Sequence, residues 1–479
     1  MRKNQLLATM KTCLLVMAGG IMASCADTYD GGENFEGGVR NAQLTSPNAD
    51  EIVIKESTDG SQMTIEWPVV FGAGGYEFQL LNASDETKPI VNDTIDGCKT
   101  TVNREEDMNY VITVRPLGNK QFNNTEAATP CRRIHSTFTK PYSQIPAGDL
   151  YNYFQENPIS DTVKIEQELN FDLAPGAEYT LSKSIDFKYH KVVLRSTDKS
   201  NPVTITLADS ANFIVSNDFT LKYAVVDAST CVKPVFEAYK YNGDPDTILA
   251  KPGNYFLIDF VRIIGCQFKG VMGSFFYDNN KSWCVVNFLI KNTTIEMNTT
   301  TSSVKNESFI SFQGGGIKDF TIQNSTIYQK GEGNSKYFLR YNNSVRVDRL
   351  GYSKEVDHTT LNYLNNTFYK VASGQWANYS GISNYSIYNI QNNIWYECAD
   401  GEIARRMMGN GRLGNNCSAI WSYNTYWKNG EQKLQGTYDT GVQLTTDPAF
   451  TDPDNFIFLP TGAEQVAKQT GDTRWYGAE

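Results

Sequence analysis

Ten side chains in the C-terminal half of the chain are of types that bind sugars. Aromatic rings offer flat apolar faces on which sugar rings pack, and guanidinium groups donate hydrogen bonds to hydroxyl and carboxylate oxygens. The candidates are Trp376, Tyr379, Trp421, Tyr423, Tyr328, Tyr369, Tyr396, Arg405, Arg406 and Arg340. They predict a glycan-binding surface, and arginines beside Trp376 would suit an acidic polysaccharide. A solvated loop is the alternative explanation for the arginines.

Groups that could carry out catalysis are scarce. The three histidines, His135, His190 and His358, leave little material for a metal site or a Ser/His/Asp triad. Calcium needs several oxygen ligands close together, and hydrolases need paired carboxylates. The repeated strands described below are nearly free of Asp and Glu. The sequence therefore predicts no metal and no cofactor, with calcium needed only by a lyase, and it leaves catalytic residues unknown.

Six related runs must position these side chains. They are VRIIGCQF (261–268), FLIKNTTI (288–295), FTIQNSTI (320–327), LNYLNNTF (361–368), YNIQNNIW (388–395) and IWSYNTYW (420–427). The first, third and eighth positions are almost wholly apolar, and the fifth is Asn in every run but the first, which has Gly. Repeats of this kind bury a continuous core when they stack on one another.

The fifth position has a geometric explanation. Asn and Gly tolerate the left-handed backbone region, so each run bends there and a second strand begins. Stacked coils place parallel strands about 4.8 Å apart, and we expect the Asn side chains to form a ladder. Its members are Asn292, Asn324, Asn365, Asn392 and Asn424. The sequence predicts an all-β chain with a right-handed, single-stranded parallel β-helix over residues 159–465.

The same alignment separates inward from outward positions, because side chains alternate along a strand. The outward second and fourth positions are rich in amides and bases, which hydrogen-bond to sugar hydroxyls. The inward eighth position includes Trp395 and Trp427, which we expect in the core. The ninth position holds Tyr328, Tyr369 and Tyr396, which either contact a ligand or stack on one another beneath a loop.

Residues 46–138 form a separate unit. The alternating runs MTIEWPVV, GYEFQLLN and NYVITVRPLGN lie among turn-rich segments, which indicates a small β-sandwich. We expect Trp67 in its core and Tyr110 as a tyrosine corner. On these two residues the unit resembles a fibronectin type III-like domain, which implies a spacer or interaction module. In the junction over residues 139–158, GDLYNYFQ predicts a short helix that caps the β-helix.

The N-terminus carries a targeting signal. Residues 1–24 combine MRK with a short apolar core, which indicates a secretory signal too short to span a bilayer. Cys25 follows two small residues, which resembles a bacterial lipobox and implies acylation of Cys25. Residues 25–45 are acidic and Gly-rich, as in a flexible tether. Acidic residues after such a cysteine resemble a surface-export signal, so we expect a lipid-anchored outer-membrane protein that faces the cell exterior.

Charge and cysteine spacing bear on the possible ligands and on disulfide formation. The formal charge of -10 and the lack of a basic block argue against nucleic acid. The cysteines after Cys25 form no CxxC pair, so a Cys98–Cys131 disulfide is one option and buried apolar filling the other. Residues 466–479 are assigned to a C-terminal tail.

The order of these parts resembles surface lipoproteins of bacterial glycan-utilisation loci. In those proteins a fibronectin type III-like domain precedes a pectin lyase-like β-helix, and DPAFTDPDNFIFLPTGA (447–463) resembles the terminal stretch of that superfamily. The resemblance implies capture of a polysaccharide or oligosaccharide at the outer membrane, alongside other glycan-uptake proteins. A polysaccharide lyase acting on a uronate-containing glycan is the first alternative, and a structural or adhesin protein is the second. The missing acidic cluster favours binding over catalysis.

Overall fold

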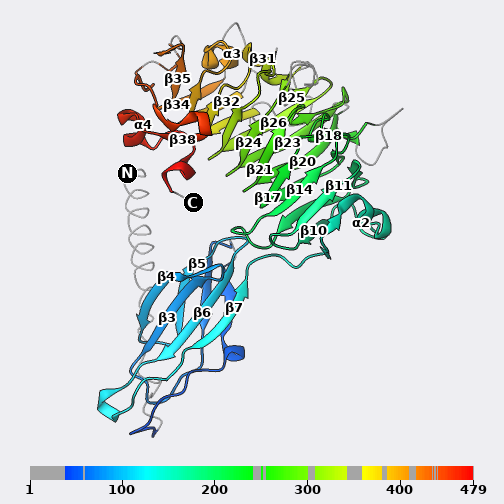
Figure 1. The fold of residues 1–479 in the computed structure, drawn as a ribbon. Coiled ribbons are helices and arrows are strands. Elements are labelled where there is room, and N and C mark those ends of the chain that lie inside the picture. The colour runs from blue at the N-terminus through cyan, green and yellow to red at the C-terminus, as the bar shows by residue number, and fades with distance from the viewer. Residues whose placement is uncertain are drawn as a thin grey trace, which may run out of the picture. The chain divides into compact units, whose positions relative to one another are not determined.

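The computed structural model divides into two compact units, Met1–Phe138 and Thr139–Glu479 (Figure 1). It describes residues 38–57, 60–240, 250–251, 255–299, 308–341, 359–379, 386–408, 417–433, 435, 438–439 and 441–477. Cys25, the predicted signal segment and most of the predicted tether lie outside the described residues. Among the described helices, none has the length and apolar character needed to cross a membrane.

The first unit consists of two antiparallel sheets that share one core. One sheet has the order β1 (Val53–Glu56), β2 (Gln62–Glu66) and β5 (Lys99–Asn103). The other has the order β4 (Asp85–Ile95), β3 (Tyr76–Asn82), β6 (Asn109–Pro116) and β7 (Cys131–Ser136). Short 3-10 helices, η1 (Ala49–Glu51) and η2 (Lys120–Phe122), complete the unit. This arrangement confirms the predicted β-sandwich.

Two predicted core features are present in this sandwich. Trp67 is buried and its ring stacks on Phe78, with centroids 5.9 Å apart. The hydroxyl of Tyr110 accepts a hydrogen bond from the backbone N–H of Glu105 at 2.9 Å, as in a tyrosine corner. Cys98 and Cys131 are both free, so the optional disulfide is not formed. The fibronectin type III-like assignment stays a prediction.

The second unit is the predicted right-handed parallel β-helix, whose coils contribute strands to three parallel sheets (Figure 1). The first sheet runs through β8 (Ser143–Ile145), β10 (Glu168–Leu173), β13 (Lys191–Ser196), β16 (Phe219–Lys222), β20 (Tyr255–Ile264), β23 (Trp283–Lys291), β26 (Gly316–Gln323), β29 (Thr359–Leu364), β32 (Ser386–Gln391) and β34 (Ser418–Ser422). The short β19 (Ala250–Lys251) pairs antiparallel with β20.

Two further sheets close each coil. The second sheet runs through β9 (Gly148–Asp149), β11 (Glu178–Leu181), β14 (Val203–Leu207), β17 (Ala224–Asp227), β21 (Gln267–Val271), β24 (Thr294–Met297), β27 (Thr326–Gln329), β30 (Thr367–Tyr369), β33 (Ile394–Tyr396), β35 (Thr425–Lys428) and the antiparallel β36 (Glu431–Gln432). The third runs through β12 (Ile185–Asp186), β15 (Phe213–Val215), β18 (Phe236–Ala238), β22 (Phe276–Tyr277), β25 (Ser308–Phe312), β28 (Tyr337–Tyr341) and β31 (Gln375–Tyr379).

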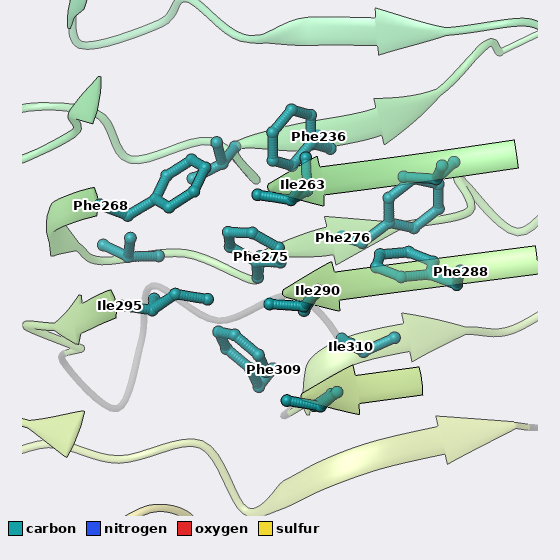
Figure 2. Close-up of a cluster of buried hydrophobic side chains, with 14 of the residues drawn as sticks. Phe236, Ile263, Phe268, Phe275, Phe276, Phe288, Ile290, Ile295, Phe309 and Ile310 are labelled. Atoms are coloured by element: carbon teal, nitrogen blue, oxygen red, sulfur yellow. The ribbon is translucent and has the colours of Figure 1, made fainter. Parts of the chain in front are cut away.

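Stacked apolar side chains fill the interior of the coils. Phe275 stacks on Phe309 at 5.2 Å, and Phe309 stacks on Phe338 at 5.1 Å, so one aromatic column follows the helix axis. Figure 2 shows Phe275 and Phe309 beside Ile290 and Ile295, which come from the first and second sheets. Each coil therefore buries its apolar positions against the coils before and after it.

The predicted bend is confirmed in four of the five Asn positions. Asn292, Asn324, Asn365 and Asn392 have φ angles of 52°, 47°, 56° and 57°, which lie in the left-handed region. In the last coil the residue at the bend is Tyr423, with φ 53°. The cause is a register difference, since Gln391 pairs with Ser422 and Ile390 pairs with Trp421. The alignment of that run was therefore wrong by one residue.

The predicted amide ladder is wrong in position. The hydrogen-bonded ladder consists of the residues that follow each bend, where Asn366 donates to Asn393 at 2.9 Å and Asn393 donates to Asn424 at 3.0 Å. These three side chains are fully buried, whereas the Asn residues at the bends are half-buried. A buried amide needs partners, and the neighbouring coils supply side-chain and backbone acceptors for these amides. Asn424 belongs to this ladder rather than to the bend.

Both ends of the β-helix carry short helices. The predicted cap is confirmed as α2 (Leu150–Glu156), whose Phe154 packs edge-on against Phe171 at 5.1 Å. At the other end α3 (Ile403–Met408) buries most of its side chains against the core. Residues 447–477, here called the C-terminal strap, contain β37 (Phe450–Asp452), η6 (Pro453–Asn455), β38 (Ile457–Pro460), α4 (Ala463–Lys468) and η7 (Thr473–Tyr476).

Candidate functional site

The outer face of the first sheet carries a row of polar side chains across three coils. Thr321, Asn362 and Asn389 occupy matched positions in β26, β29 and β32. Asn362 donates to the hydroxyl of Thr321 at 2.9 Å, and Asn389 donates to the amide oxygen of Asn362 at 2.7 Å. All three are half-buried. We call these three residues the outer row.

The outer row has hydrogen-bonding capacity left over. Within the described part of the chain, no side chain donates to the amide oxygen of Asn389. The hydroxyl of Thr321 accepts from Asn362 and keeps its own proton to donate. A further hydrogen bond lies beside the row, where Ser422 donates to the side-chain oxygen of Gln391 at 3.2 Å. The predicted amide-rich outward face is therefore present on β26, β29 and β32.

A charged cluster lies on the same sheet, in earlier coils, and the sequence alignment did not find it. Lys191 contacts Asp218 at 2.8 Å and Asp259 at 3.6 Å. Arg262 contacts Glu168 at 3.4 Å. Glu168 and Asp218 belong to coils outside the six aligned runs, and Asp259 precedes the first run by two positions. The alignment therefore gave no indication that these charges lie close together. Each described cation of this cluster faces a carboxylate.

The environment of Lys191 keeps its side chain protonated. Burial alone would lower the pKa of Lys191, but the hydrogen bond to Asp218 and the charges of Asp218 and Asp259 raise it above its ordinary value. A general base must be neutral before it can accept a proton. Lys191 is therefore suited to hold two carboxylates in place and poorly suited to proton abstraction.

The predicted tyrosines of the second sheet are covered by the strap. Tyr328 and Tyr369 are buried, and Tyr396 is half-buried and stacks on Tyr369 at 5.3 Å. Phe458 of the strap packs on Tyr328 and Tyr369, with centroid distances of 5.3 and 4.9 Å. Of the two options that the sequence left open, the structure supports stacking beneath another segment. The assignment of Tyr328 and Tyr369 as glycan contacts is wrong, because Phe458 packs on both buried rings, whereas that of the half-buried Tyr396 stays a prediction.

Tyr328 also has a fixed polar partner. Its hydroxyl donates to the carboxylate of Glu296 at 2.9 Å. Burial raises the pKa of Tyr328 above its ordinary value, and the bond to Glu296 and the negative charge there raise it further. The phenol therefore stays protonated and bound to the neighbouring coil.

Two predicted tryptophan contacts are core residues. Trp376 is fully buried and continues the aromatic column, stacked on Phe338 at 4.2 Å with an interplanar angle of 8°. Trp421 pairs with Ile390 and belongs to the same core, because the register of the last coil turns it inward. Neither ring can offer its face to a sugar without unfolding of the coil. By the same shift Tyr426 takes the inward place predicted for Trp427, beside Trp395.

The predicted arginines do not form an unpaired basic patch. Arg405 pairs with Glu402 at 2.5 Å, and Arg406 pairs with Asp400 at 2.7 Å. Both acids belong to the segment at the start of α3, so the positive charge is balanced locally. The guanidinium of Arg340, on β28, lies 5.8 Å from the ring centroid of Tyr337. These arginines therefore do not support the prediction that the protein binds an acidic polysaccharide.

Two aromatic candidates remain. Tyr423 is 38% exposed, and the ammonium of Lys468 lies 4.4 Å from its ring centroid. Tyr379 ends β31, and its side chain lies outside the described residues. In the described ranges no group of three His, Cys, Asp or Glu side chains could hold a metal ion. The conditional calcium site of a lyase stays a prediction.

Comparisons with known proteins match the chain in parts. A family model for a domain of unknown function, DUF4992, matches residues 1–176, and a model for a domain of unknown function (DUF4957) matches residues 177–330. The first match extends beyond the boundary between the two units into the β-helix. No curated protein matches the chain.

Four chains of known structure match this chain, and one of them is a bacterial pectate lyase. It is pectate lyase PelI from Erwinia chrysanthemi in complex with tetragalacturonic acid, with 11% identity over 79% of this chain and 100% of that chain, and a TM-score of 0.21. A TM-score this low carries no argument about function. The β-helix assignment rests instead on the parallel pairing of consecutive coils.

Proposed function

We propose that the protein binds polysaccharide without cleaving it, along the outer face of the first sheet. The observation that carries this proposal is the outer row, in which Thr321, Asn362 and Asn389 repeat one polar position on three consecutive coils. Parallel strands are about 4.8 Å apart. A linear polymer of sugar rings that crosses the strands meets the same type of hydrogen-bonding group at each step.

The chemistry of the face supports binding rather than catalysis. The outer row supplies neutral donors and acceptors, which suit hydroxyl groups. A lyase needs a base to remove a proton, and among the described residues of this face Lys191 is held protonated by Asp218 and Asp259. An unsaturated, ultraviolet-absorbing product released from a uronate polymer would establish the lyase alternative instead.

The location of the protein belongs to the same proposal. Acylation of Cys25 would fix the chain to the outer membrane, and the acidic tether would let it face the exterior. Labelling with radioactive palmitate tests this step, with Cys25→Ala as the matched change. The native chain should take up label and the variant should not.

The binding proposal is tested by affinity electrophoresis through gels that contain plant or host polysaccharides. At least one polysaccharide should retard the protein, and Asn362→Ala/Asn389→Ala should weaken that retardation about tenfold, since each lost hydrogen bond contributes about 0.5–1.5 kcal/mol. Gln121→Ala, at an exposed position of the first unit, is the matched control and should change nothing. Equal retardation of the double variant and the native protein would contradict the proposal.

A further inference from the structure

A hollow of about 480 Å³ lies between the second sheet and the C-terminal strap. Gln267 and Thr294, on β21 and β24, line one side of it. Asn455, Phe456 and Trp475 of the strap line the other. Pockets for small ligands typically measure about 300–1,000 Å³ and combine apolar walls with a few polar groups. This hollow has that size and composition, and it lies on a different sheet from the outer row.

Its aromatic walls are held in fixed orientations. The indole N–H of Trp475 donates to the hydroxyl of Thr326 at 2.9 Å, while its ring packs edge-on against Phe458 at 5.9 Å. Phe456 stacks on Tyr328 with centroids 4.8 Å apart and an interplanar angle of 24°. Rings held in this way lose little freedom when a ligand packs on them.

Phe456 adopts a backbone conformation that its side chain disfavours. Its φ angle is 61°, in the left-handed region, which is unfavourable for a residue with a Cβ. Such strain persists only where the surrounding structure enforces it, and it is concentrated at functional sites. The turn places the Phe456 ring at the edge of the hollow.

Polar groups with unused capacity line the same space. Gln267 is exposed, and no described residue hydrogen-bonds to its side-chain amide. The amide oxygen of Asn292 is buried and accepts no hydrogen bond from the described protein. A buried acceptor without a donor is uncommon in folded proteins. Both residues line the hollow, and the exposed amide of Gln267 could meet hydroxyl groups placed there, whereas the amide oxygen of Asn292 is enclosed.

The hollow carries no unbalanced charge. Arg474 is the charged residue among those that line it. Its guanidinium contacts the carboxylate of Asp472 at 2.6 Å, the backbone oxygen of Asn292 at 2.8 Å and the hydroxyl of Thr294 at 3.1 Å. Because these contacts engage its donors, Arg474 forms part of the wall. Recognition of a ligand would fall to the side-chain amide and the aromatic rings.

We propose that this hollow is a second carbohydrate site, which takes one uncharged sugar ring. The ring would pack on Trp475 and Phe456, and its hydroxyl groups would bond to the side-chain amide of Gln267. The proposal does not depend on the outer row, because no residue is shared between the two surfaces.

Saturation-transfer NMR of the whole protein tests this site with five separate probes: glucose, galactose, xylose, rhamnose and galacturonate. At least one neutral sugar should receive saturation and bind more tightly than galacturonate. Gln267→Ala should weaken that binding at least fivefold. Lys269→Ala is the matched control, since Lys269 is exposed on the same strand and does not line the hollow, and it should bind as the native protein does.

Two outcomes would overturn the proposal. One is the absence of saturation transfer to every neutral sugar, and the other is a neutral-sugar affinity that Gln267→Ala leaves unchanged. Trp475→Phe gives a second reading, because it keeps a ring at the wall while it removes the bond to Thr326. Asn362→Ala/Asn389→Ala should leave this affinity unaltered, so failure here is distinguishable from failure of binding at the outer row.

Discussion

The first and second sheets of the β-helix each carry an outward-facing row of side chains with the same spacing. The two rows differ in whether the C-terminal strap covers them. On the first sheet, Thr321, Asn362 and Asn389 form a half-buried polar row. On the second, the tyrosines of β27 and β30 are buried beneath the strap. The comparison teaches that aromatic side chains on a repeated outer face need not mark a ligand site, because the chain itself can supply the segment that covers them.

The difference follows from what each row offers. Tyrosine rings expose large apolar area, and covering that area stabilises the fold by about 25 cal/mol per Å². Amides and hydroxyls gain little from being covered unless every group finds a partner. The strap therefore stabilises the second sheet, whereas the polar row of the first sheet can remain available to a ligand. The following changes test that contrast, from the largest expected effect to the smallest.

Phe458→Ala should destabilise the β-helix strongly. Phe458 is fully buried and contacts rings from both β27 and β30, so its removal should lower the free energy of unfolding by about 3–5 kcal/mol. Chemical denaturation of the variant and the native protein measures the change. A loss below about 1 kcal/mol would mean that the strap does not hold the tyrosines in solution.

Asp472→Asn should loosen the last turn of the strap. Asp472 is buried, accepts a hydrogen bond from Thr326 at 2.7 Å and pairs with Arg474. Neutralising it leaves the guanidinium without its charged partner, and we expect a loss of about 2–3 kcal/mol. Asp454→Asn, at an exposed position of the strap, is the matched control. Similar denaturation midpoints for both variants would argue against a structural role for the pair.

Asp439 should make stability depend on pH. Burial raises its pKa from 3.8 to about 6, although the hydrogen bond from Tyr426 works against that increase. Because the folded pKa exceeds the unfolded one, the free energy of unfolding should fall as pH rises from about 4 to 6 and level off above, by about 2 kcal/mol.

Asp439→Asn provides the test. The variant has no carboxyl group to titrate at this position, so its unfolding free energy should vary less between pH 4 and pH 7 than that of the native protein. Denaturation curves at both pH values measure the difference. An equal pH dependence in both proteins would show that Asp439 is not the group responsible.

Asn362→Ala should have the smallest effect on stability. Its side chain is half-buried and its two hydrogen bonds are to other outer-row side chains, so we expect a loss of no more than about 0.5–1 kcal/mol. The same denaturation experiment measures it. A loss as large as that of Phe458→Ala would mean that the outer row is a structural element rather than a binding surface.

The sequence predicted the architecture well because its main signal is local. Apolar alternation and the Asn at each bend are visible within eight residues, and they predicted the coil, the left-handed bends and the core position of Trp395. The cap helix α2 was also visible, in GDLYNYFQ. The last coil failed because Tyr423 replaces Asn at the bend, which shifted the assignment of Trp421.

The candidate site was harder to predict because its determinants are distant in sequence. Tyr328 and Phe458 are 130 positions apart, and no local pattern shows that one covers the other. Lys191 and Asp259 are 68 positions apart, and they meet because a single coil, that of β16, separates β13 from β20 in the first sheet. The amide ladder lay one residue from its predicted place because only burial distinguishes Asn392 from Asn393.

The most direct measurement compares the two faces in one affinity electrophoresis experiment. Asn362→Ala/Asn389→Ala changes the first sheet, and Tyr396→Leu removes an aromatic ring from the second while keeping apolar volume. With a polysaccharide that retards the native protein, the first variant should lose most of the retardation and the second should keep it. Loss of retardation in Tyr396→Leu alone, with the double variant unaffected, would contradict the account.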